Sequence, residues 1–152
     1  VVAAALAAGE IVHADDERVA DAIAVGREVA ARLATALTLD AAWDVETVTA
    51  GIAATMAAAH AAGLDAAQAE NALGLAATQA AGLGVLAGVP AEDFLRAKSA
   101  ADAVEAAFLA RHGFTAAPRA LEGGQGLARL LASRLDQDAL TAELGVRWIS
   151  AP

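Results

Sequence analysis

The segment ERVADAIAVGREVAARLATAL, residues 17–37, decides the fold class of this chain. Its apolar and small residues recur at alternating spacings of four and three, which places them on one stripe of an α-helix. The stripe consists of Val19, Ile23, Gly26, Ala30, Leu33 and Leu37. Glu28 and Arg32 stand four residues apart, and we expect them to pair on the surface. The pattern predicts a helix over residues 17–37 that buries one face.

Helical patterns continue on both sides of this segment, and the alternation typical of strands is nowhere sustained. The other expected helices cover residues 1–12, 45–62, 66–81, 91–111, 126–134 and 138–144. The helix over residues 91–111 is expected to bury a stripe of Phe94, Ala97, Ala101, Val104 and Phe108. Residues 145–152 are expected to form a tail or the start of a further segment. We therefore predict an all-α fold, a compact multi-helix bundle, as a single domain over residues 1–152.

The composition predicts an unusual core. Apolar residues make up 58% of the 152 residues but aromatic residues only 3%, and alanine carries most of the apolar count. A core of alanine has little volume per side chain, so its helices must approach closely and depend on many small contacts. We expect such a contact where Gly26 and Ala30 lie on the inward stripe.

Charge and residue content exclude several classes of protein. The formal net charge of −9 argues against nucleic-acid binding and against an anionic membrane surface. The absence of cysteine excludes disulfides, iron–sulfur clusters and thiol catalysis. Residues 71–91 lack formal charge over the length of a membrane span, but Asn71, Thr78, Gln79 and several glycines favour a helix buried by other helices. We expect a cytoplasmic protein without a signal peptide.

Few residues offer chemistry by themselves. The three histidines, His13, His60 and His112, lack partners at metal-ligand spacing, so we expect neither a metal nor a cofactor. Lys98 has two possible roles: it binds a substrate carboxylate or moves a proton, or it is a solvated lysine paired with Asp102 four residues on. Asp44 stands at a helix start, where capping is the simplest role.

Seven stretches, in order along the chain, resemble the patterns of one known family. They are the alanine-rich run that ends at Glu10, AIAVGREVAARL at 22–33, GIAATMAAAHAAGLD at 51–65, NALGLAATQAAGL at 71–83, residues 98–113 followed by Phe114-Thr115, ALEG at 120–123, and Arg147-Trp148. Together they resemble the helical domain of the MmgE/PrpD family, whose members include 2-methylcitrate dehydratase and cis-aconitate decarboxylase. The resemblance implies a helical domain related to lyases and isomerases that act on small polycarboxylates by moving a proton next to a carboxylate.

The resemblance also implies a site, and this sequence departs from it. Asp44 stands where the family pattern calls for histidine, and Glu92 and Leu95 stand where it calls for lysine and histidine. The candidate catalytic residues are Lys98 and Asp44, and the candidate substrate-binding residues are Arg96 and Gln79.

Two hypotheses for the function follow. Carboxylates at these positions would repel a polycarboxylate, so the first hypothesis is a helical domain that is inactive as an isolated chain and serves assembly or small-molecule binding. The alternative is an active lyase, completed by missing segments or a partner chain. We expect a fragment or truncated member of the family without its second, α+β domain, which forms a homo-oligomer or requires that missing partner domain.

Overall fold

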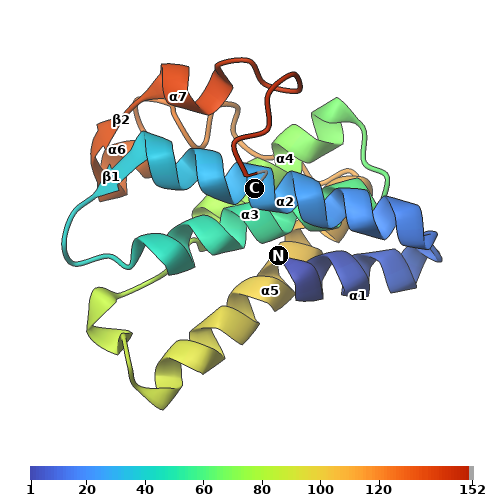
Figure 1. The fold of residues 1–152 in the computed structure, drawn as a ribbon, viewed down its shortest axis with the longest axis horizontal. Helices are drawn as coiled ribbons and strands as arrows, with labels where there is room; N and C mark the ends of the chain where they lie inside the picture. The colour runs from blue at the N-terminus through green and yellow to red at the C-terminus, as the bar shows by residue number, and fades with distance from the viewer. Residues whose placement is uncertain (151–152) are drawn as a thin grey trace.

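Helix α3 (Val45–Ala61) lies at the centre of the structure, and helices α1, α2, α4 and α5 all pack against it (Figure 1). The computed structural model describes residues 1–150. The helices around α3 are α1 (Val2–Val12), α2 (Asp16–Ala36), α4 (Ala66–Gln79) and α5 (Pro90–Arg111). Short elements complete the chain: the 3-10 helix η1 (Gly84–Leu86), α6 (Leu127–Leu131) and α7 (Gln137–Thr141). The prediction of a helical bundle is confirmed.

Two short strands depart from that prediction. Strand β1 (Leu37–Leu39) pairs antiparallel with β2 (Ala132–Leu135), and Leu37 lies opposite Leu135. The predicted second helix therefore ends one residue early, at Ala36, and the helix expected over residues 126–134 ends at Leu131. The cause is tertiary, because each strand finds its hydrogen-bond partner about 95 residues away.

Local signals fix most helix starts. The Asp15 side chain accepts a hydrogen bond from the Arg18 backbone N–H at 2.8 Å at the start of α2. Asp65 and Gln68 form a reciprocal capping box at the start of α4, with distances of 2.8 and 3.1 Å. Pro90 occupies the first position of α5, where its missing N–H costs nothing.

The interior consists of two clusters of different composition. The first, here called the alanine core, joins α1, α2, α3 and α5 and contains only alanine among its fully buried members: Ala4, Ala5, Ala8, Ala22, Ala54, Ala57, Ala58, Ala59, Ala61, Ala103 and Ala107. The second, here called the leucine core, joins α2, β1, α3, α4 and α6 and consists of Leu33, Leu37, Val48, Ile52, Ala77, Leu121, Leu127, Ala128 and Leu131.

Helices α2 and α3 approach most tightly at Gly26, in the alanine core. A Cβ atom on Gly26 would lie 2.8 Å from the Ala57 Cβ and 3.0 Å from the Ala53 carbonyl oxygen. Both distances are shorter than ordinary van der Waals contact, so only glycine fits. The expected close contact at Gly26 is confirmed, whereas Ala30, one turn further on, is only partly buried.

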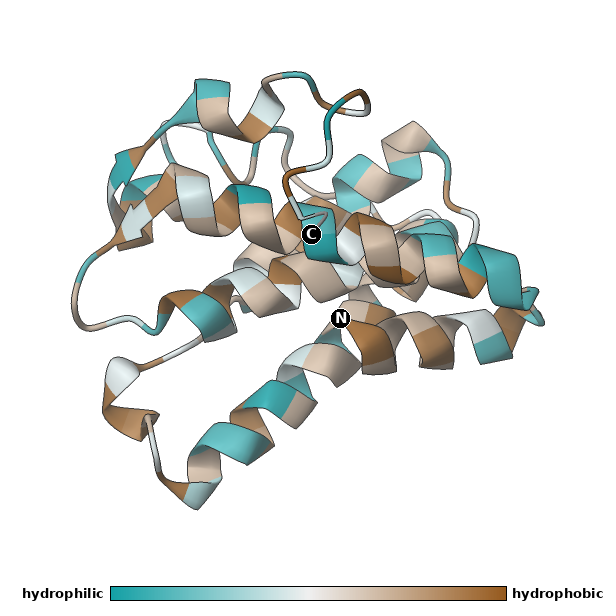
Figure 2. Cartoon of the chain, viewed as in Figure 1, coloured by the Kyte–Doolittle hydropathy of each residue, from teal (hydrophilic) through white to brown (hydrophobic). Residues whose placement is uncertain are grey.

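The predicted inward stripe of α5 is wrong. Phe94 is 69% exposed, and the buried residues are instead Ala103, Ala106, Ala107 and Ala110. The first half of α5 projects away from the bundle and carries several hydrophilic residues (Figure 2). In the second half the close approach to α3 admits alanine and leaves the larger Val104 and Phe108 at the border of the core.

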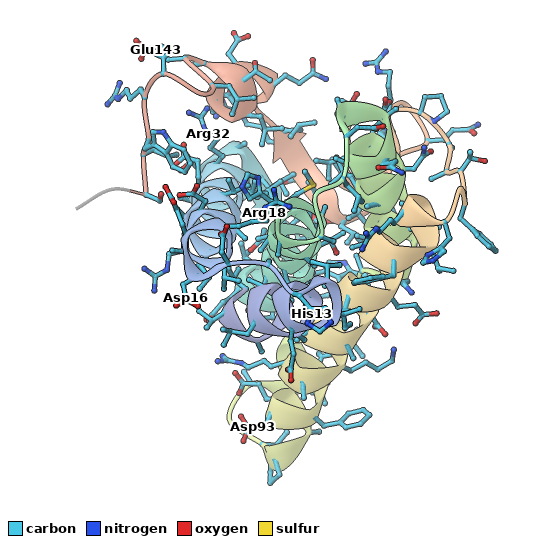
Figure 3. All side chains as sticks on the ribbon, turned by 90° about the vertical axis from the view of Figure 1, so that its right-hand side faces the viewer. His13, Asp16, Arg18, Arg32, Asp93 and Glu143 are labelled. Carbon is cyan, nitrogen blue, oxygen red and sulfur yellow. The ribbon has the colours of Figure 1, made fainter. Side chains whose placement is uncertain are left out.

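The C-terminal segment is held by a buried ion pair. Arg32 donates from Nε to Glu28 at 2.6 Å, and the two side chains are only 3% and 8% exposed, so the expected pair forms but not on the surface. The Arg32 guanidinium also donates to the carbonyl oxygens of Leu140, Ala142 and Arg147 at 3.0, 2.9 and 2.8 Å. Figure 3 shows Arg32 beneath the segment that carries Glu143.

Glu28 completes this arrangement, here called the Glu28–Arg32 clamp. Its carboxylate accepts hydrogen bonds from the backbone N–H groups of Ile149 and Ser150 at 3.2 and 2.9 Å. Burial alone raises the pKa of Glu28, but the hydrogen bonds from Ser150, Arg32 and Ile149 outweigh it and lower the pKa to about 2. Main-chain groups of Arg147, Ile149 and Ser150 thus bind to the side chains of α2. Residues 151–152 of the expected tail lie outside the described residues.

No helix within residues 1–150 combines the length and the apolar content that crossing a membrane requires. The uncharged stretch at 71–91 is divided between α4, the loop with η1 and the first turn of α5.

Candidate functional site

The start of α3, the first half of α5 and the end of α4 lie close together, and they carry the residues singled out in the sequence. Arg96 on α5 reaches Glu46 at the start of α3, with an N–O distance of 3.7 Å. Arg96, Glu46, Thr47 and Ser99 line a cavity of about 210 Å³ between α3 and α5, which Val1 also borders. This region is the candidate functional site.

Asp44 acts as the N-cap of α3. Its carboxylate accepts hydrogen bonds from the backbone N–H of Glu46, at 3.2 Å, and from the hydroxyl of Thr47. The expected capping role is confirmed. The charge of Asp44 also makes a minor contribution to the pKa shifts of Glu92 and Arg96, raising the pKa of each.

Two carboxylates hold Arg96. Glu92, one turn earlier on α5, accepts a hydrogen bond from the guanidinium of Arg96 at 2.6 Å. The charge of Glu46 and then the bond to Glu92 raise the pKa of Arg96 above its ordinary value. The pKa of Glu92 is lowered, first by a hydrogen bond from the Gly88 backbone N–H at 2.7 Å, against an opposing effect of burial, and further by Arg96. The side chain of Arg96 is 48% exposed, so this ion-pair network is wet and weak.

Lys98 is also paired. Its ammonium lies 2.7 Å from both carboxylate oxygens of Asp102, as the spacing of four residues predicted. Asp102, together with Ser99, lines a small cavity of about 20 Å³ beside Gln79. That volume holds about one water molecule, not a substrate.

The structure thus gathers some candidates and separates others. Asp44 and Arg96 lie together, Gln79 faces the small cavity next to them, and Lys98 is not among the residues lining either cavity. Sequence reasoning missed Thr47 and Ser99 as lining residues. Their positions three residues after Asp44 and Arg96 place them on the same helix faces, a signal that was available.

Within residues 1–150, no group of three or more histidine, aspartate or glutamate side chains is arranged to hold a metal ion. The functional groups present at the site are hydroxyls, one amide, four carboxylates and two cationic side chains.

Comparison with known families agrees with the helical architecture. The family model of the MmgE/PrpD N-terminal domain matches residues 1–139. The chain belongs to the MmgE/PrpD family. The resemblance drawn from the ordered motifs is therefore confirmed for the helical domain, while no curated protein matches the chain. The match to the MmgE/PrpD N-terminal domain spans the positions of Asp44, Glu92 and Leu95.

Proposed function

We propose that this chain is a MmgE/PrpD helical scaffold domain that, by itself, does not turn over 2-methylcitrate or cis-aconitate. One observation carries the proposal: the two cationic side chains of this region, Arg96 and Lys98, are already held by carboxylates of the same chain. A family member that acts on polycarboxylates needs cationic groups free to bind the substrate and to stabilise the charge that develops during proton transfer.

Electrostatics at the site supports this proposal. Four carboxylates, Asp44, Glu46, Glu92 and Asp102, surround two cations, so a polyanionic substrate meets excess negative charge. Each unscreened like-charge contact near 4 Å costs roughly 1–4 kcal/mol at a wet or half-buried site. A lost acid–base group commonly lowers the rate by a further factor of about 10²–10⁴.

The alternative is a lyase that becomes active when further segments or a partner chain complete the site. Arg96 and Lys98 are 48% and 54% exposed, so an added domain could reach them and displace their carboxylate partners. Under this alternative Lys98 and Asp44 act on the substrate's proton, and Arg96 and Gln79 bind its carboxylates.

A direct assay separates the two. Purified chain is incubated with 2-methylcitrate or cis-aconitate, and double-bond absorbance and released carbon dioxide are followed. We expect no turnover above buffer. Turnover that disappears in Lys98→Ala, and persists in the control Arg27→Ala on the exposed face of α2, would overturn the proposal and assign the chemistry to Lys98.

We also propose that the domain works in the cytoplasm as an oligomer or against a partner domain. Large apolar side chains at the surface support association, among them Val85, Phe94 and Val146 at 80%, 69% and 83% exposure. Light scattering across the micromolar range should give a mass above that of one chain. A clean monomer at every concentration would contradict self-association.

A further inference from the structure

A further cavity, separate from the two at the candidate site, lies on the leucine-core side of the molecule. It measures about 510 Å³, within the range of pockets that hold small molecules. Apolar side chains from α2, α3, α4, α7 and the adjoining loops form most of its wall: Val29, Leu33, Ile52, Met56, Leu73, Leu121, Leu140 and Leu144. It is here called the apolar cavity.

The charges around the apolar cavity compensate one another. Arg32, in its wall, is neutralised by Glu28 at 2.6 Å, and Arg119 at its edge is paired with Glu122 at 3.0 Å. Asp138, also in the lining, adds negative charge. No cation of the lining is thus left to attract an anion, and exposed Asp138 is screened by solvent. The cavity favours an uncharged molecule, unlike the polycarboxylates considered above.

Arg32 supplies one polar contact. A guanidinium has five N–H donors, and four are used by Glu28 and by the carbonyls of Leu140, Ala142 and Arg147. Within residues 1–150 one Nη2–H therefore remains without an acceptor, on a residue that is only 3% exposed. A buried donor of this kind favours a ligand that brings a hydrogen-bond acceptor.

We propose that the apolar cavity binds a neutral small molecule with an apolar body and one carbonyl-type acceptor, which accepts the remaining N–H of Arg32. Helix α7 and Leu144 form one wall of this site, and the Glu28–Arg32 clamp holds that wall in place. The inference is independent of the proposed function, because it concerns other residues and an uncharged ligand.

The test uses the full chain and the neutral fluorophore 6-propionyl-2-dimethylaminonaphthalene, whose emission shifts to the blue in apolar surroundings. We expect blue-shifted emission that saturates at one dye per chain and is not displaced by cis-aconitate. The analogue without the propionyl group should bind several-fold more weakly. Equal binding of the two dyes would overturn the acceptor contact with Arg32.

Variants localise the dye. Leu73→Trp and, independently, Met56→Trp fill the apolar cavity and should weaken binding by about tenfold or more. Leu130→Trp is the matched control, because Leu130 lies on α6 outside the cavity at 77% exposure and should leave binding unchanged. Circular dichroism shows which variants keep the fold, and two cavity variants keep the test decisive if one unfolds.

Three results would overturn the proposal. They are no blue shift in the wild-type chain, equal loss of binding in all three variants, and unchanged binding in both folded cavity variants. Dye binding that weakens as protein concentration rises would show that a second copy of the chain covers the cavity, and would likewise overturn it.

Discussion

The alanine core and the leucine core share helices α2 and α3 but are stabilised in different ways. In the alanine core the helices nearly touch, and Gly26 leaves no room for even one methyl group. In the leucine core the buried side chains are larger, and the apolar cavity lies beside them. The comparison teaches that the packing of one helix pair can depend on backbone contact at one end and on side-chain volume at the other.

The largest expected effect comes from removing volume from the leucine core. Leu33 is 1% exposed, so Leu33→Ala should lower the free energy of unfolding by about 2–5 kcal/mol, measured by urea denaturation. Leu130→Ala, the same change at a position 77% exposed, should stay within about 0.5 kcal/mol of wild type. Equal effects of the two changes would show that Leu33 is not a packing residue.

A smaller loss is expected from adding volume to the alanine core. Gly26→Leu forces side-chain atoms into the contact with Ala53 and Ala57 and should lower stability by about 1–3 kcal/mol, measured by thermal melting. An unchanged melting temperature would show that α2 and α3 do not approach closely at this point.

Gly51→Ala is the matched control, and its expected effect on stability has the opposite sign. A Cβ atom there would lie 3.8 Å from the Cβ of Ser99, an ordinary contact, and Gly51 is inside α3. Gly51→Ala should therefore raise stability by about 0.5–1 kcal/mol, because alanine favours the helix. A loss in this variant would indicate that α3 and α5 are closer than the structure shows.

Local loosening in acid is also expected at the leucine-core end of α2. The pKa of Glu28 is lowered from 4.5 to about 2, so its contribution to stability is fully present above pH 4.5 and is lost as the pH falls through about 2. In a Trp43→Phe background, Trp148 fluorescence reports on the C-terminal segment, since the chain has two tryptophans. Its emission should change over this window before the helical circular dichroism does.

The control for this titration is Glu28→Gln. It removes the titrating group, so the acid transition of Trp148 between pH 4.5 and 2 should disappear. A transition that remains in this variant would falsify the assignment to Glu28.

Local features of the fold could be predicted, and contacts between distant segments could not. The cap at Asp65, the glycine contact at Gly26 and the pairing of Lys98 with Asp102 all follow from spacings of a few residues. The stripe predicted for α5 failed in the first half of the helix because that half projects away from the bundle (Figure 2). In the second half, the close contact with α3 buries alanine and leaves the larger Val104 and Phe108 at the border of the core.

The candidate site shows the same limit. Asp44 as an N-cap could be predicted from its place before a helix, but the contact between Arg96 and Glu46 joins residues 50 positions apart. The burial of Glu28 and Arg32 was missed for the same reason, since their partners lie more than 100 residues further along the chain. The spacing of two charged residues along a helix predicts that they pair, but it does not predict whether distant segments of the chain bury the pair.

The Glu28–Arg32 clamp has a consequence for sequence divergence. Its hydrogen bonds with residues 140–150 are mostly to main-chain carbonyl and N–H groups, and the Ser150 side chain also forms a hydrogen bond with Glu28. The side chains of Ala142, Arg147 and Ile149 can therefore change without loss of these hydrogen bonds, except that proline at position 149 would remove a donor. Leu140 and Leu144, in contrast, line the apolar cavity. Glu28 and Arg32, by contrast, must change together or not at all, because either one alone would leave a charge buried without its partner.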